Sequence, residues 1–326
     1  MPDSITFGPM KKQYFTLVIF LLCIQLQAQE SHLKNIKQLT FGGDNAEAYF
    51  SFDNNALTMQ VTNPKAGIPC DQIYLRQLHT NDTTMQLLST GKGRTTCSFF
   101  MPGNKSVLYA STHADADSCP PPPAPRSDRK YLWPLYPSFD IYVASLDGKI
   151  TRQLTNEPGY DAEATVSPDG KMIVFTSDRS GDLELYAMNI DGSNVKQITF
   201  GLGYDGGAFF SPDSKKLVFR SSRPTSEADV KEYKELLKQG LVPPTNMEID
   251  TSNVDGSELK QITHLGKANW APYFHPSGKK IIFASNHASD RGYDFQLYMI
   301  NTDGTGLTQI TQESNFNAFP MFSYDG

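Results

Sequence analysis

One phrase recurs along this chain, and it constrains the fold more than any other feature of the sequence. It opens on a Ser-Pro-Asp-Gly turn, continues through two apolar strands, and closes on Gln-Ile-Thr or Gln-Leu-Thr. Such a period marks repeated supersecondary units rather than a fold built around one local motif. The openings stand at Ser51, Met101, Ser167, Ser211, His275 and Ser323, and those at Ser167 and Ser211 are the clearest.

The copy in residues 161–199 predicts four antiparallel strands. Residues 164–166, 172–175, 183–189 and 195–199 are the apolar stretches. The turn at 167–170 is tight, because its proline presets φ and its glycine supplies a positive φ. Asp191-Gly192 is a strong hairpin signal. Four antiparallel strands form one blade of a β-propeller.

Counting the copies predicts an all-β, six-bladed β-propeller. Closing phrases end at Thr40, Thr155, Thr199, Thr263 and Thr311, with a looser one at 86–88. We expect the sixth blade to be truncated at the C-terminus, with 318–322 as its opening strand and 36–40 as its outer strand. The alternative is a five-bladed ring with a stray tail.

Length, charge and the N-terminus limit the class of protein. The chain has 326 residues and a formal charge of −6, which argues against a general nucleic-acid or anionic-membrane surface. Residues 1–29 read as an export signal, with Lys11 and Lys12 before an apolar stretch at 15–26, and the true start is either Met1 or Met10. We therefore expect residues 30–326 to form a periplasmic or secreted propeller with no transmembrane segment.

Three cysteines remain once the signal is removed. They are Cys70, Cys97 and Cys119. In an oxidising compartment one pair bridges and one thiol is left over. We expect Cys70 to pair with Cys97, because both fall near the first two blades, and the alternative is three buried thiols.

Two long insertions decorate one face of the predicted ring, between second and third strands. The first covers 114–139 and holds a proline run and the aromatic cluster 131–136, which either anchors a partner or packs on its blade. The second covers 224–248 and predicts a helix at 226–239. Its apolar stripe, which either docks on the propeller or binds a partner, consists of Val230, Tyr233, Leu236 and Leu237.

Two rings of polar residues emerge when the copies are aligned, and both belong to the decorated face. Six residues before the openings stand Asn45, Asp161, Asp205, Asn269 and Asn317, followed two residues later by Glu47 and Glu163. The second ring holds His113, Arg179, Arg223 and His287. With Trp270, they form our candidate binding funnel. Alternatively, the Asn and Asp side chains satisfy loop backbone and the arginines pair with the neighbouring blade.

The repeats from about Ile36 onward resemble the PD40 repeats of TolB-type propellers, most strongly at 167–199. That resemblance implies participation in a protein complex at the cell envelope. TolB itself carries a separate domain before its propeller, whereas few residues here separate the signal from Ile36, which argues against a Tol–Pal role. The same repeat occurs in propellers attached to proteases, so it specifies fold better than activity.

No motif for catalysis stands in the sequence. There is no Gly-x-Ser-x-Gly, no His-Glu-x-x-His and no phosphate-binding glycine loop. His113 and His287 fall in blades that are not adjacent, too far apart to share an ion. We expect no cofactor and no metal, and a module that binds an envelope protein, a peptide or a glycan. The alternative is a lyase-like or protease-associated propeller acting on oligosaccharide or peptide.

Overall fold

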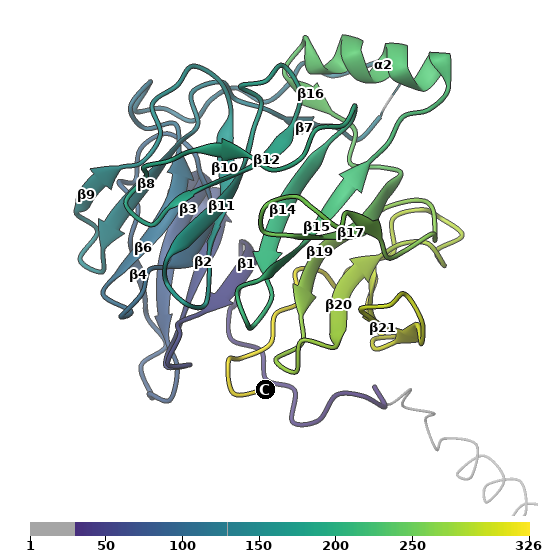
Figure 1. Cartoon of the computed structure of the whole chain (residues 1–326). Helices are drawn as coiled ribbons and strands as arrows, with labels where there is room; N and C mark the ends of the chain where they lie inside the picture. The colour runs from purple at the N-terminus through teal and green to yellow at the C-terminus, as the bar shows by residue number, and fades with distance from the viewer. Residues whose placement is uncertain (1–29, 129) are drawn as a thin grey trace, which may run out of the picture.

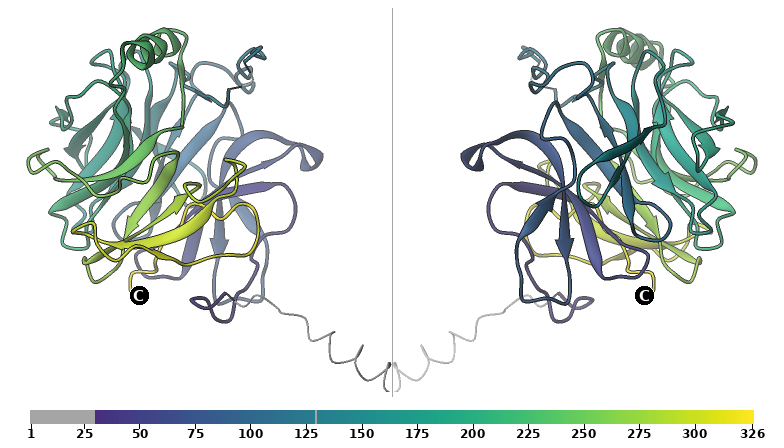
Figure 2. Two further views of the ribbon diagram at one scale, coloured as in Figure 1. Left: turned by 90° about the vertical axis from the view of Figure 1, so that its right-hand side faces the viewer. Right: turned by 90° about the vertical axis from the view of Figure 1, so that its left-hand side faces the viewer.

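The fold is an all-β propeller, seen in a computed structural model that describes residues 30–128 and 130–326. The predicted export signal at 1–29 lies outside the described residues. Figures 1 and 2 show the sheets arranged around a common axis. No helix in the described part of the chain is long and apolar enough to cross a membrane.

Five four-stranded antiparallel sheets follow one another along the chain. The first consists of β1 (Asp44–Phe50), β2 (Ala56–Asn63), β3 (Ile68–Gln77) and β4 (Met85–Leu87). The second consists of β5 (Thr95–Phe100), β6 (Ser106–Ser111), β8 (Asp140–Ser145) and β9 (Ile150–Gln153). The third consists of β10 (Asp161–Val166), β11 (Met172–Ser177), β12 (Glu184–Asn189) and β13 (Lys196–Gln197). The fourth consists of β14 (Asp205–Phe210), β15 (Lys216–Ser222), β17 (Met247–Asn253) and β18 (Lys260–Gln261). The fifth consists of β19 (Asn269–Phe274), β20 (Lys280–Ser285), β21 (Gln296–Asn301) and β22 (Thr308–Gln309).

The opening turn of the repeat is held by its own side chains. Ser167 Oγ donates to Asp169 Oδ1 at 2.7 Å and accepts from the backbone N–H of Met172 at 3.0 Å. Gly170 takes a φ of +73°, which suits glycine at this turn. The same serine–aspartate bond, at 2.6 Å, recurs between Ser211 and Asp213. The Ser-Pro-Asp-Gly phrase therefore forms the hairpin turn between the first and second strands of a blade, and its own side chains stabilise that turn.

The innermost strands surround the axis. β1 contacts β5, β5 contacts β10, β10 contacts β14, and β14 contacts β19. Between neighbouring blades lies a core with fully buried side chains such as Leu108, Ile173, Phe175, Val218 and Phe283. This packing fixes the positions of the inner strands and hence of the channel between them.

The prediction of six blades is wrong, because the described residues form five four-stranded sheets. Residues 318–322 and 36–40, predicted as strands of a sixth blade, have no strand structure. The C-terminal segment is held by side chains instead of by a ladder of backbone hydrogen bonds. Met321 Sδ accepts from the backbone N–H of Phe50 at 3.2 Å, and Tyr324 stacks on Phe52 with ring centroids 4.9 Å apart.

The predicted helix is present in the second insertion. α2 (Glu227–Leu237) begins after Ser226, whose side chain accepts from Asp229 N, and the chain turns at Gly240 with a φ of +67°. Tyr233 and Leu236 are buried. The apolar stripe of the helix therefore docks on the propeller.

Candidate functional site

The innermost strand of each blade carries a β-bulge at the same place. In β1 the register shifts between Ala46 and Tyr49, and equivalent shifts occur in β5, β10, β14 and β19. One residue of each bulge has a left-handed backbone, which re-aims its side chain. These residues are Glu47, Cys97, Glu163, Gly207 and Ala271, and together with Phe319 they line one narrow cavity of about 20 Å³.

The two insertions meet over the channel mouth and form a roof, which we define as residues 130–136 and 227–242. β7 (Trp133–Pro134) pairs antiparallel with β16 (Leu241–Val242), and Leu135 N donates to Gly240 O at 2.7 Å. Lys130 and Glu232 form an ion pair. Figure 1 shows α2, β16 and β7 together at one end of the propeller, away from the C-terminus.

Beneath the roof lies a pocket of about 790 Å³. Its wall is dominated by aromatic side chains: Tyr131, Trp133, Tyr136, Phe139, Tyr160, Tyr204, Trp270, Tyr293, Phe295, Phe316 and Phe319. Trp133 and Trp270 have ring centroids 5.2 Å apart, and Trp270 stacks on Phe295 at 4.2 Å. An apolar wall with a few converging polar groups is typical of a ligand site.

An ion pair between Glu163 and Arg220 forms one side of the pocket floor. Glu163 Oε2 also accepts from the Tyr204 hydroxyl at 2.6 Å, Thr176 Oγ1 at 2.7 Å and Gly207 N at 3.0 Å. The pair is nearly buried, with side-chain exposures of 11% for Glu163 and 8% for Arg220. Removing one partner from such a pair leaves an uncompensated buried charge.

Aromatic rings and a glycine hold the Arg220 guanidinium in place. Its central carbon lies 5.0 Å from the Trp133 ring centroid and 5.2 Å from that of Tyr204, within cation–π range. A Cβ at Gly207 would lie 2.0 Å from Arg220 Nη1, so the fourth bulge has no room for a side chain. The roof residue Trp133 is therefore coupled to the floor through Arg220.

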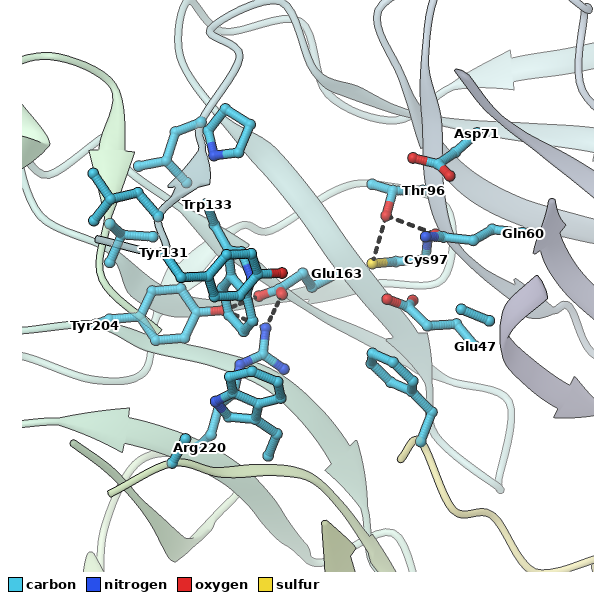
Figure 3. A pocket seen from close by; sticks show the side chains of 18 of the residues that line it. Glu47, Gln60, Asp71, Thr96, Cys97, Tyr131, Trp133, Glu163, Tyr204 and Arg220 are labelled. Atoms are coloured by element: carbon cyan, nitrogen blue, oxygen red, sulfur yellow. Dashed lines mark hydrogen bonds and ion pairs between the residues drawn. The ribbon is translucent and has the colours of Figure 1, made fainter. Parts of the chain in front are cut away.

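Glu47 faces this ion pair from the first blade, as Figure 3 shows. Among the described residues no ion pair forms with Glu47, and its Oε2 has no hydrogen-bond partner. Burial raises the pKa of Glu47 to about 7, and the nearby Glu163 carboxylate adds to this. Burial also raises the pKa of the adjacent Cys97 thiol well above its usual range. At neutral pH the floor therefore holds a carboxyl group poised between its two protonation states.

A second ion pair, between Asp71 and Arg94, lies at the edge of the pocket. Asp71 also accepts from Thr62 Oγ1, and Thr96 Oγ1 donates to Gln60 Oε1 at 3.0 Å. These groups are largely satisfied by one another. Chemically, the arrangement suits binding: apolar walls, satisfied polar edges and one carboxylate without a partner. Within the described ranges, no three His, Cys, Asp or Glu side chains come together as metal ligands.

Comparisons with known proteins agree with this architecture. Residues 137–236 match the PD40 family model, described as the TolB beta propeller domain. The Tol-Pal system protein TolB of Bordetella pertussis is 50% identical over 42 residues, 13% of this chain and 10% of that protein. An uncharacterized protein of Agrobacterium fabrum is 30% identical over 176 residues, 53% of this chain and 38% of that protein.

Two solved structures share the fold. The putative TolB from Agrobacterium tumefaciens superposes with a TM-score of 0.59 at 22% identity, covering 82% of this chain and 81% of that one. TolB from Acinetobacter baumannii gives 0.60 at 21% identity, covering 84% and 55%. Residues 137–236 are thus similar to the TolB-type PD40 β-propeller family, and the chain shares the propeller fold of these two structures. It spans 10% to 38% of the length of the curated relatives quoted above.

Within this propeller, three of the residues selected from the sequence line the pocket, namely Glu47, Glu163 and Trp270. The structure brings them together from β1, β10 and β19. The Trp270 indole N–H donates to Pro244 O at 2.8 Å, which ties the inner strand to the second insertion.

Other selected residues pair within their own blades. Arg179 donates to both oxygens of Asp161 at 2.9 and 2.8 Å, and Arg223 donates to Asp205 Oδ1 at 2.6 Å. Each pair joins the start of an inner strand to the loop after the next strand. Pairing with the neighbouring blade was an alternative role for the arginines in the sequence analysis, but both arginines pair within their own blade.

The Asn ring bonds backbone carbonyl groups, and the two histidines make local contacts. Asn45 Nδ2 donates to Gly42 O at 3.1 Å, Asn269 Nδ2 to Met247 O at 2.8 Å, and Asn317 Nδ2 to Glu313 O at 2.7 Å. His113 and His287 each bond a serine two residues earlier, at 2.9 Å. None of these five residues lines the pocket.

Sequence reasoning missed several pocket residues, Arg220 above all. Arg220 follows the apolar stretch Leu217–Phe219 inside a buried strand. A charged residue at such a position could have indicated a pocket residue from the sequence. Cys97 stands two residues after Thr95, the same alignment position as Glu47 and Glu163. The roof was missed because β7 and β16 are far apart in sequence and only two residues long each.

The expected disulfide partner is wrong. Cys70 bonds Cys119, with Cα atoms 6.0 Å apart, and Cys97 is free. The first insertion brings Cys119 back onto β3 of the first blade, whereas the bulge in β5 places Cys97 at the channel. The disulfide therefore ties the start of the first insertion to the neighbouring blade.

Proposed function

We propose that this chain is a binding module of the cell envelope, exported to the periplasm or beyond, which takes an apolar or aromatic segment of a protein partner into the roofed pocket. The observation that carries the proposal is the aromatic wall beneath the paired insertions. Sequence similarity to TolB-type propellers supports a protein partner, since one similar protein is named as a component of the Tol-Pal system.

Three features of the pocket favour a protein segment. Its volume of about 790 Å³ accommodates several side chains. Tyr131, Tyr293 and Phe316 at its wall are 64%, 59% and 55% exposed, so aromatic surface is left for a partner to cover. Clustered aromatic residues beside an arginine are the commonest hot spots of protein interfaces.

The test is selection of binders followed by a matched pair of variants. A phage-displayed library of random peptides is selected on the wild-type protein, and the enriched peptides are synthesised. Phe316→Ala removes an exposed aromatic ring from the pocket wall, whereas Phe200→Ala removes one that is 76% exposed and outside the pocket. We expect enriched peptides rich in aromatic and apolar residues, with affinity about fivefold to tenfold weaker for Phe316→Ala and unchanged for Phe200→Ala.

Two results would reject the proposal. One is a selection that enriches no sequence. The other is a set of peptides whose affinities are the same for both variants and the wild type, because such peptides bind elsewhere on the propeller.

A further inference from the structure

One carboxyl group in the pocket, that of Glu47, has no cationic partner among the described residues. The charged lining of the pocket consists of three carboxylates and two guanidinium groups. Glu163 is paired with Arg220 and Asp71 with Arg94, and no described residue pairs with Glu47. A buried or half-buried charge normally has a partner, because desolvation without one is costly. The missing partner is therefore expected from a ligand.

The bulge in β1 directs Glu47 toward this position. Glu47 has a φ of +51°, and it lines both the roofed pocket and the narrow cavity below it. Its Oε2 has no hydrogen-bond partner among the described residues. Figure 3 shows the Glu47 carboxylate beside Cys97, pointing toward the open centre of the pocket, across from Glu163 and Arg220. A donor that enters between the aromatic walls would meet Glu47 at the bottom.

We propose that the pocket binds an ammonium group at the Glu47 carboxylate, carried on an aromatic or apolar body that lies against the wall. The inference rests on the proposed function, because it assigns a ligand chemistry to the same pocket. Aromatic faces attract cations as well as apolar groups, so Trp270 and Phe319 suit both parts of such a ligand. Two sources supply this chemistry: the amino terminus of a chain and a lysine side chain.

The surroundings of Glu47 agree with a cationic ligand. Cys97 on β5, Glu163 on β10, Arg220 on β15 and Asp71 on β3 face it, and burial raises the pKa of Glu47 to about 7. A bound ammonium group favours the ionised carboxylate and lowers that pKa. Binding at pH 7 therefore releases a proton from Glu47, and the affinity for an amine that stays protonated, such as a lysine side chain, increases from pH 6 to pH 8.

The experiment compares 2-phenylethylamine with 2-phenylethanol, which share a ring and differ in the charged group. Binding at pH 8 is followed by tryptophan emission, since Trp133 and Trp270 both line the pocket. For the wild type we expect the amine to bind about tenfold more tightly than the alcohol, the effect of one charge-assisted hydrogen bond. Glu47→Gln is expected to abolish the preference. Asp44→Asn, an exposed acid on the same strand, is expected to preserve it.

Dipeptides separate the two sources. Phe-Ala amide with a free amino terminus, its acetylated form, and acetyl-Phe-Lys amide are titrated in the same way but at pH 7, where an amino terminus with a pKa of about 7.7 to 8.0 is mostly protonated. Tighter binding of the first indicates a chain terminus, and tighter binding of the third indicates a lysine. Either result supports the inference if Glu47→Gln removes the advantage.

Equal affinity of amine and alcohol, failure of the amine to saturate, or a preference that survives in Glu47→Gln overturns the inference. The proposed function is judged separately. If both small molecules bind equally and Phe316→Ala weakens both, the aromatic pocket stands and only the ammonium site is lost.

Discussion

At the scale of single residues, Glu47 and Glu163 occupy equivalent bulges and differ in partner. Glu163 has Arg220, Tyr204 and Thr176 around it, whereas Glu47 has the Cys97 thiol as its neighbour. Alignment of the repeats located both glutamates, because the position has a fixed distance from the turn. It could not locate Arg220, whose guanidinium occupies the space that a side chain at Gly207 would fill.

The raised pKa of Glu47 makes stability depend on pH. Its pKa rises from 4.5 to about 7 in the folded protein, so the folded state holds the proton more tightly. Stability therefore falls as pH rises from about 4.5 to about 7, and the cost amounts to about 3 kcal/mol above that range. We predict that Glu47→Gln raises the free energy of unfolding by about 2 to 3 kcal/mol at pH 8 and has little effect at pH 4.5.

Urea unfolding at pH 4.5, 6, 7 and 8 measures this difference. Asp44→Asn removes an exposed acid from the same strand and serves as the control. If Glu47→Gln and the wild type keep parallel pH profiles, Glu47 has no raised pKa in the folded protein.

At the scale of elements, neighbouring blades are joined by a polar contact that repeats. Asn269 Nδ2 donates to Glu248 Oε2 at 3.1 Å, and Asn317 Nδ2 donates to Gln296 Oε1 at 3.0 Å. Between the third and fourth blades the equivalent residues are two acids, Glu184 and Asp205. The alignment showed the ring of Asn and Asp but not its partners, which lie at the start of the third strand of the preceding blade.

The acid pair lacks the amide donor that Asn269 and Asn317 supply at their junctions. Glu184 Oε2 and Asp205 Oδ2 have no hydrogen-bond partners in the described residues, and burial raises the pKa of both carboxyls. A raised carboxyl pKa means that stability is lost as pH rises through it. We predict that Asp205→Asn raises the free energy of unfolding by about 1 kcal/mol at pH 9 and by less at pH 6.

Thermal unfolding at pH 6 and pH 9 tests this prediction, with Asp161→Asn as the matched variant. Both oxygens of Asp161 are bonded to Arg179, so that variant is expected to lose about 1 to 3 kcal/mol at both pH values. Destabilisation by Asp205→Asn at pH 9 would show that its pairing with Arg223 outweighs the contact with Glu184.

The disulfide restrains the first insertion and, through it, the roof. Cys70 and Cys119 are 49 residues apart in sequence, and closing a loop of that length stabilises a fold by about 4 kcal/mol at most. We predict that Cys119→Ser lowers the free energy of unfolding by about 2 to 4 kcal/mol. Reductant should bring the wild type to the same value in urea unfolding.

Cys97→Ser is the control for that measurement, because Cys97 is free. It should keep both the stability of the wild type and its sensitivity to reductant. Loss of that sensitivity in Cys97→Ser would place the bond at Cys97 instead of Cys119.

At the scale of the whole molecule, the repeats predicted an all-β propeller and the insertions but miscounted the blades. A short turn phrase indicates only a local hairpin, not a whole blade. The phrase at Ser323 therefore led to the prediction of a sixth blade, although residues 318–322 form no strand. The positions of the two insertions, between second and third strands, were predicted from the sequence and are observed. Their pairing was not predictable, because it depends on the ring bringing the second and fourth blades to one mouth.

The measurement that tests the central claim most directly is tryptophan emission during titration with a selected peptide. The chain has two tryptophans, Trp133 on the roof and Trp270 on β19, and both line the pocket. We predict saturable changes in emission for the wild type and for each single-tryptophan variant, Trp133→Phe and Trp270→Phe, with the dissociation constant that calorimetry gives for the same variant. Binding that calorimetry detects while both indoles remain unaffected would contradict the claim that the roofed pocket is the binding site.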